Sequence, residues 1–147
     1  MNNSLQEYLN FANKLADAAG NTSMEYFRTS LSIDNKNDES PVTIADKNTE
    51  LKIRSMIEKE YPDHGILGEE FDSINSDAEF IWVIDPIDGT RSYIAGHKDF
   101  GNLISLTQNK KPIIGIINCP AHDERWVGVK NQSSTVNQQT VNTSSVT

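Results

Sequence analysis

The pattern of hydrophobic and polar residues predicts a long helix at the start of the chain. Apolar residues recur at helical spacing after Ser4, which predicts a helix over residues 4–27, loosened at Gly20. Ser4 with Glu7 three residues later forms a capping box for its first turn.

A second helical pattern follows a polar segment. Residues 32–40 are mostly polar and charged, and they predict a loop or a weak hairpin. Thr43 with Asp46 forms another capping box, and Pro62 ends the pattern because the residue before a proline disfavours the helical conformation. The chain therefore begins with a pair of helices.

The middle of the chain predicts short strands joined by turns. Residues 109–111 are typical of a hairpin turn, and Thr90 is expected to cap a short helix over 91–95. Helices followed by mainly antiparallel strands indicate an α+β fold. The predicted strands are 65–68, 80–84, 100–107, 112–120 and 124–129.

The last segment, residues 131–147, contains only Asn, Gln, Ser, Thr and Val. On composition alone this polar, uncharged tail favours disorder.

Composition narrows the class of protein. A chain of 147 residues suits one domain, and its net charge of −8 argues against a nucleic-acid partner. Cys119 is the only cysteine, so the cytoplasm is the simplest compartment, and its place in a strand-like run indicates a packed thiol rather than a nucleophile. No apolar run approaches the ~20 residues of a membrane span, and the first residues lack the features of a signal peptide.

The apolar run Phe80–Ile84 leads into two acids, Asp85 and Asp88, followed by Gly89. Two anions held together in a poorly hydrated place repel each other, and a hard divalent cation such as Mg²⁺ removes that cost. Gly89 allows the backbone to approach a ligand closely. An ordinary Asp-Gly turn after a strand is the alternative interpretation.

The nine-residue string 82–90 resembles the first signature of the inositol monophosphatase family of Mg²⁺-dependent phosphatases. Residues 40–46 resemble the family's earlier motif, and 68–70 resemble its acidic loop. Within the family, 88–94 and 124–128 resemble the histidinol-phosphatase branch.

The resemblance covers the chain from Asn3 to Thr147, but only the front part of the family. It implies a layered α/β sandwich of the sugar-phosphatase superfamily, of which residues 1–147 supply the first helix pair and the first antiparallel sheet. In that fold the polar tail forms two short strands around a turn at Asn137 and Gln138. The full-length form is expected to be a homodimer.

The resemblance also implies a metal site with two or three Mg²⁺ ions, which Mn²⁺ could replace. Glu69, Asp85 and the carbonyl of Ile87 would bind the first ion. Asp85 would bridge to a second ion, which Asp88 also binds, and Glu70 would contribute to a further position.

The catalytic roles come from the same resemblance. Glu69 and Thr90 would hold and activate the attacking water, with Asp46 hydrogen-bonding behind Thr90. The amides of Gly89 and Thr90 would bind the phosphate, and Arg91 would influence substrate choice. Read alone, Asp46 is an ordinary first-turn acid and the two glutamates are an exposed loop.

The function implied is Mg²⁺-dependent hydrolysis of a small phosphorylated alcohol, foremost L-histidinol phosphate in histidine biosynthesis. An inositol-1-phosphatase, a nucleotide 3′-phosphatase and an inactive remnant or metal-binding module stay open. The family's later Asp, which completes the second metal site, and most alcohol-binding residues have no counterpart in this chain. Lys36 could face the metal site. The histidines 64, 97 and 122 are expected to be surface or structural residues, and the tryptophans 82 and 126 are expected to lie in the core.

Overall fold

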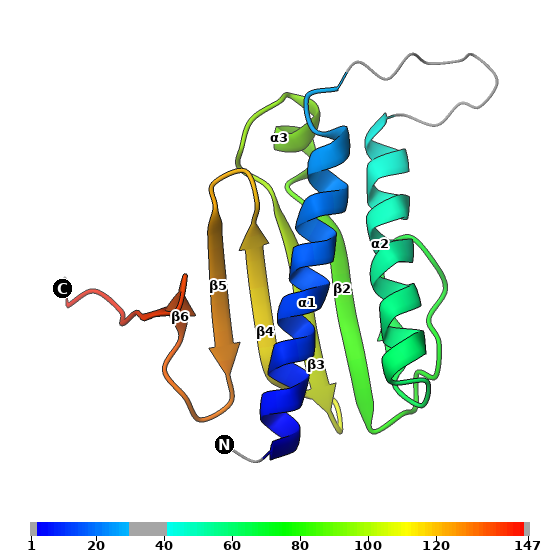
Figure 1. Cartoon of the computed structure of the whole chain (residues 1–147), viewed down its shortest axis with the longest axis vertical. Coiled ribbons are helices and arrows are strands. Elements are labelled where there is room, and N and C mark those ends of the chain that lie inside the picture. Colours follow the sequence, from blue (N-terminus) through cyan, green and yellow to red (C-terminus); the bar gives the residue numbers. More distant parts are fainter. Residues whose placement is uncertain (1–2, 30–40, 146–147) are drawn as a thin grey trace.

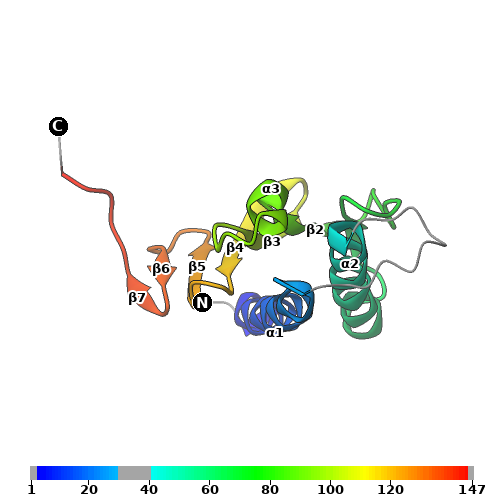
Figure 2. The same cartoon turned by 90° about the horizontal axis from the view of Figure 1, so that it is seen from above.

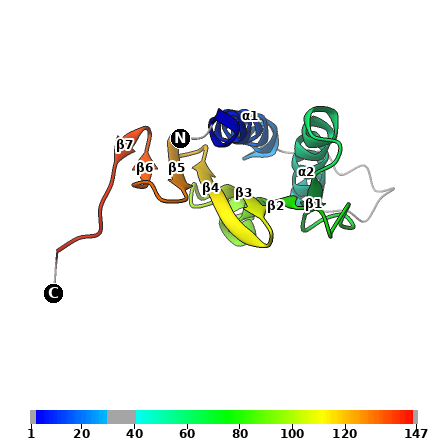
Figure 3. The ribbon, with the colours of Figure 1, turned by 90° about the horizontal axis from the view of Figure 1, so that it is seen from below.

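The computed structural model describes residues 3–29 and 41–145. Within these residues the chain forms a seven-stranded sheet with two long helices on one face, an α+β fold as predicted. Helices α1 (Asn3–Tyr26) and α2 (Pro41–Glu60) lie side by side on that face (Figure 1), and both end-on views place them on the same side of the sheet (Figure 2 and Figure 3). The predicted loop over 32–40, including Lys36, lies outside the described residues.

Both long helices begin before their predicted caps. Ser4 and Thr43 lie inside α1 and α2 respectively, so neither is the N-cap residue expected from a capping box. Helix α1 continues through Gly20 without interruption. None of the helices in the described part of the chain is long and apolar enough to cross a membrane.

The strands are ordered along the sheet as they are along the chain. All neighbours are antiparallel except β1 and β2, which are parallel, so the sheet is mixed and the prediction of mainly antiparallel strands is confirmed. The connection over 68–79 runs back beside the sheet, which a parallel pair requires. The strands are β1 (Gly65–Leu67), β2 (Phe80–Asp88), β3 (Gly101–Gln108), β4 (Lys111–Cys119), β5 (Glu124–Val129), β6 (Thr135–Val136) and β7 (Gln139–Thr140).

The main core lies between the helix pair and the sheet. Leu15 of α1 and Ile53 of α2 are fully buried against Trp82 of β2 and Ile104 of β3, so the prediction that Trp82 is core is confirmed. Burying each such side chain contributes about 1.5–3 kcal/mol to folding.

The opposite face of the sheet is not covered by either long helix (Figure 2). Strand pairing places Leu103, Ile117 and Trp126 in one row across this face. Ile117 is 50% exposed and Trp126 is 41% exposed. The prediction that Trp126 is core is therefore wrong for the described chain, because the register turns its side chain away from the helices.

The polar tail forms a hairpin, so the prediction of disorder from composition is wrong over residues 135–140. Strands β6 and β7 turn at Asn137 (φ 45°) and Gln138 (φ 69°), as the family resemblance implied. The side-chain amide of Asn137 accepts from the Arg125 amide and donates to the Asp123 carbonyl, both at 2.9 Å. These bonds fix the turn against β5 in place of a glycine.

A two-residue turn at Asn109 (φ 49°) and Lys110 (φ 63°) joins β3 to β4, as predicted. Lys110→Gly should raise the free energy of unfolding by about 0.5–1 kcal/mol. The left-handed conformation costs a non-glycine residue roughly 1–2 kcal/mol, and the greater freedom of glycine in the unfolded chain offsets part of the gain.

Urea denaturation measures the change, with Lys111→Gly in the adjoining strand as the matched control. The control should lose about 0.5–1 kcal/mol, because glycine weakens a strand. An equal loss in both variants would contradict the strain assigned to Lys110.

Candidate metal and phosphate site

Acidic residues from three separate segments meet near the end of β2. Strands β1 and β2 are parallel, and Leu67 pairs with Val83, so both strands run out at the same edge. Glu69 follows the end of β1, while Asp85 lies in the last part of β2. The first turns of α2 bring Asp46 to the same place, where the Glu69, Glu70 and Asp85 carboxylates all act on its charge.

Strand β2 does not end at Ile84 as predicted but continues to Asp88. The pairing with β3 is irregular between Asp85 and Asp88, where Pro86 lacks an amide hydrogen. This bulge sets the direction of the two acids, and bulges recur beside active sites for that reason.

Asp85 carries the clearest sign of an incomplete site. Its Oδ1 atom is buried and has no hydrogen-bond partner among the described residues. Burial, the neighbouring Glu69 charge and a hydrogen bond between the two carboxyl groups raise the pKa of Asp85 to about 7, against a smaller lowering by the Ile87 amide. Two carboxyl groups in contact must share a proton or a cation.

Asp46 is 7% exposed, which is unusual for an acid at the start of a helix. Burial raises its pKa to about 7, with further contributions from Glu70, Glu69 and Asp85. The pKa of Glu70 is raised by burial and by Glu69. The interpretation of Asp46 as an ordinary solvated first-turn acid is therefore wrong.

These residues fit a hard cation. The buried Oδ1 of Asp85 lacks a partner, and the neighbouring Glu69 and Asp88 supply carboxylate oxygens, the ligand type that Mg²⁺ prefers. Among the described residues, no three His, Cys, Asp or Glu side chains already have the spacing of a metal ligand set. The two carboxyl groups in direct contact are those of Glu69 and Asp85. The acids Asp46, Glu70 and Asp88 lie near enough to interact electrostatically with the members of this group.

The predicted phosphate-binding residues lie just beyond this pair, around α3 (Thr90–Ile94). Gly89, not Thr90, is the residue before the helix; it has φ 83°, and an added Cβ would lie 2.8 Å from the Asp99 carbonyl. The Thr90 hydroxyl donates to the Ile87 carbonyl at 3.2 Å rather than capping the helix. Asp88 and Arg91 are exposed beside them. The predicted role of Asp46 behind Thr90 stays a prediction.

Asn102 is a buried residue near the site that the sequence pattern did not single out. Its side-chain amide donates to the Pro86 carbonyl at 2.7 Å and to the Ser23 hydroxyl at 3.2 Å, and its Oδ1 accepts from Asn118 at 2.9 Å. Asn102 therefore holds the bulge between Asp85 and Asp88. The only sequence signal was an asparagine at the start of an apolar strand.

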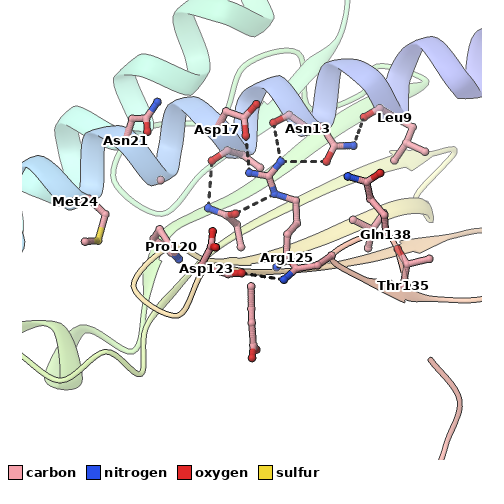
Figure 4. A pocket seen from close by; sticks show the side chains of 16 residues that line it. Leu9, Asn13, Asp17, Asn21, Met24, Pro120, Asp123, Arg125, Thr135 and Gln138 are labelled. Atoms are coloured by element: carbon pink, nitrogen blue, oxygen red, sulfur yellow. Dashed lines mark hydrogen bonds and ion pairs between the residues drawn. The ribbon is translucent and has the colours of Figure 1, made fainter. Parts of the chain in front are cut away.

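The larger of two hollows lined by described residues does not contain these acids. It has a volume of about 680 Å³ and lies between α1 and the strands β4 to β6. Figure 4 shows Arg125 crossing it to Asn13 and Asp17, and Arg125 Nη2 lies 2.7 Å from Asp17 Oδ1. A second, mostly apolar hollow of about 620 Å³ lies on the uncovered face and reaches Asp85. The second hollow is the one that adjoins the chemistry.

Other side chains considered from the sequence have structural roles. His64 accepts a hydrogen bond from Trp82 Nε1 at 3.2 Å and stacks on Tyr61, and burial lowers its pKa. His122 pairs with Asp99 at 2.9 Å. Burial raises the pKa of the Cys119 thiol, in agreement with a packed and unreactive cysteine.

Comparison with known proteins gives one consistent result. The family model described as the inositol monophosphatase family matches residues 4–147. The bifunctional phosphatase IMPL2 (chloroplastic) of Arabidopsis thaliana is 41% identical over 143 residues, which are 96% of this chain and 41% of that protein. A histidinol-phosphatase of Chlorobaculum parvum is 40% identical over 139 residues, or 94% of this chain and 54% of that protein.

Solved structures agree with the sequence matches. An inositol monophosphatase from Zymomonas mobilis superposes with a TM-score of 0.84 at 44% identity, covering 97% of this chain and 55% of the other. The chain spans about half the length of the relatives it matches.

The metal-free chain should lose stability as pH rises from about 4 to about 7. Asp46 and Asp85 have pKa values near 7 in the folded chain and near 3.9 when unfolded, so the folded state holds more protons between those limits. Thermal melts across this range, in the presence of a chelator, measure the fall.

Asp85→Asn should flatten this pH dependence and stabilise the chain at pH 8 by about 1 kcal/mol, after allowance for solvent screening. Asp77→Asn, in an exposed loop, is the control and should leave the curve unchanged. If Asp85→Asn lowers the melting temperature at pH 8, the two carboxylates do not repel each other as described.

Proposed function

This chain belongs to the inositol monophosphatase family, and we propose that it provides the metal- and phosphate-binding part of a Mg²⁺-dependent phosphatase. The substrate is a small phosphorylated alcohol, and the reaction is hydrolysis of its phosphate monoester. The observation that carries the proposal is the contact between Glu69 and Asp85, with an unpartnered buried oxygen on Asp85.

Glu69, Asp85 and the Ile87 carbonyl would hold the first Mg²⁺, Asp88 would join Asp85 around a second, and Glu70 would serve a weaker position. When bound, Mg²⁺ polarises phosphoryl oxygens and lowers the pKa of a bound water. The carboxylates fix where that charge sits, and phosphoryl transfer depends mainly on such positioning and neutralisation.

The chain's own residues would also orient the water and the phosphate. Glu69 would accept a proton from the attacking water, and the Thr90 hydroxyl would align it. Asp46 would hydrogen-bond behind Thr90, and its buried place beside Glu69 and Asp85 supports this role. The amides of Gly89 and Thr90 would bind the phosphate, and the αL backbone at Gly89 supports this close approach.

We infer L-histidinol phosphate as the first substrate to test. Residues 88–94 and 124–128 support it, as does 40% identity to a protein named histidinol-phosphatase. Inositol 1-phosphate stays a rival, because a structure titled inositol monophosphatase is 44% identical. A nucleotide 3′-phosphate is the third alternative.

The expectations about partners and compartment stay proposals too. The net charge of −8 supports the absence of a nucleic-acid partner, and the lone Cys119 supports a cytoplasmic location. We also propose that the full-length form is a homodimer and that residues 1–147 are the N-terminal part of one domain.

A metal-binding module without turnover is a second candidate. It is supported by the Glu69–Asp85 pair, which would hold a cation whether or not a substrate is turned over. The two candidates share the metal site and differ in catalysis.

Millimolar Mg²⁺ should raise the melting temperature of the chain at pH 7.5, and Mn²⁺ should raise it more. A cation that binds only the folded state stabilises it by mass action, about 2.7 kcal/mol at a hundred times the dissociation constant. Mn²⁺ binds oxygen and nitrogen sites more tightly than Mg²⁺ does.

Asp85→Asn should remove the metal-dependent rise, while Asp77→Asn should keep it. Melting temperatures that are identical with and without metal in the unaltered chain would contradict the site.

Phosphate release from the three candidate substrates separates the two functions. Typical enzymes with a complete site turn over at about 1–10³ s⁻¹. The 147-residue chain with Mg²⁺ should turn over below that range, more slowly than about 1 s⁻¹. Any release should be fastest with L-histidinol phosphate and should disappear in Asp88→Asn. A normal enzyme rate would show that the chain needs no further residues, and a preference for inositol 1-phosphate would overturn the substrate.

A further inference from the structure

A buried ion pair on α2 lies against the loop that carries Glu69 and Glu70. Glu50 is fully buried, and its Oε1 atom lies 2.7 Å from Nε of Arg54, one helical turn later. Arg54 is also buried. Charged side chains are almost never buried unless they are paired, so this pair is a deliberate feature of the packing.

Both members of the pair bind the backbone of the acidic loop. The Oε2 atom of Glu50 accepts from the Glu69 amide at 3.0 Å and from the Glu70 amide at 2.8 Å. Nη2 of Arg54 donates to the Phe71 carbonyl at 3.0 Å, and its guanidinium lies over the Phe71 ring, 5.8 Å from the centroid. Three consecutive loop residues are thus held by two side chains from another element.

Gly68 allows this close approach. A Cβ atom built at this position would overlap the Glu50 carboxylate, so any other residue would force the loop and this carboxylate apart. The glycine and the ion pair therefore act together.

Stability alone does not explain a carboxylate at position 50. Buried ion pairs are often no more stabilising than apolar residues of the same volume. The Glu50 charge also works against its acidic neighbours, since it raises the pKa of both Asp46 and Glu70. The Glu50 carboxylate provides a fixed acceptor for the Glu69 and Glu70 amides. It thereby fixes the backbone from which the Glu69 and Glu70 side chains project.

We propose that Glu50 and Arg54 are positioning residues that hold loop 68–71 so that the Glu69 carboxyl faces Asp85. The inference rests on the proposed metal site and adds the device that orients one side of it. Outer partners of this kind commonly change metal affinity by about 10–100-fold when they are removed.

The test measures Mn²⁺ affinity by calorimetric titration of the 147-residue chain and its variants. Glu50→Gln keeps the size of the side chain but places an amide donor against Arg54 or the loop, and should weaken binding at least about tenfold. Arg54→Lys should weaken it less, because a positive charge stays beside Glu50 and the Glu50 bonds to the Glu69 and Glu70 amides are kept, while the fixed fork of the guanidinium is lost.

Ile57→Val on the same helix is the control for lost stability. Ile57 is fully buried in the core two turns further on, and the loss of one methylene group there destabilises the fold modestly. Its Mn²⁺ affinity should stay within about twofold of the unaltered chain. Hydrogen exchange of the Glu69 and Glu70 amides gives a second readout, and both amides should lose protection in Glu50→Gln only.

Gly68→Ala gives an independent test should Glu50→Gln fail to fold. It places a methyl group against the Glu50 carboxylate, so the loop and that carboxylate must move apart, and Mn²⁺ binding should also weaken at least about tenfold. Unchanged affinity in Gly68→Ala or in folded Glu50→Gln would overturn the positioning role while leaving the metal site standing. No Mn²⁺ binding by the unaltered chain would overturn the proposed site, and this inference with it.

Discussion

The repulsion between the Glu69 and Asp85 carboxyl groups is the constraint around which the rest of this structure is organised. Two acids held in contact, one with a buried and unpartnered oxygen, make the folded chain less stable than it could be. Functional sites commonly carry such a cost, and the surrounding fold must supply enough stability to keep it. Here a core of helix and sheet residues, with Leu15, Ile53 and Trp82 fully buried, provides that stability.

The fold enforces the contact from both sides. Parallel pairing of β1 with β2 brings the acidic loop to the edge where Asp85 lies. Asn102 holds the bulge of β2 through the Pro86 carbonyl, and Glu50 holds the opposite loop through two amides. The loop and the bulge cannot move apart without breaking these hydrogen bonds, and a cation is the partner that would relieve the repulsion between the two acids.

The sequence indicated the acids of the candidate site more readily than the residues that hold them in place. An apolar strand followed by two acids is a local pattern, so Asp85 and Asp88 were identifiable, and the family resemblance added Glu69 and the turn at Asn137. Glu50 and Asn102 were missed because their partners lie 19 and 16 residues away, at Glu69 and Pro86. The exposure of Trp126 depends on the register between strands, which the sequence pattern did not reveal. The hairpin over 135–140 depends on the hydrogen bond of Asn137 to the start of β5, which amino-acid composition cannot predict.

The most direct test of the central claim is where a cation binds. Mn²⁺ added in small amounts to the ¹⁵N-labelled chain broadens the amide signals nearest to it. The account predicts that the amide signals of Glu69, Glu70, Asp85, Ile87 and Asp88 disappear first, together with that of Asp46. If signals around Asp123 and Glu124, beside the larger hollow, disappear first instead, the acids at the end of β2 are not the metal site.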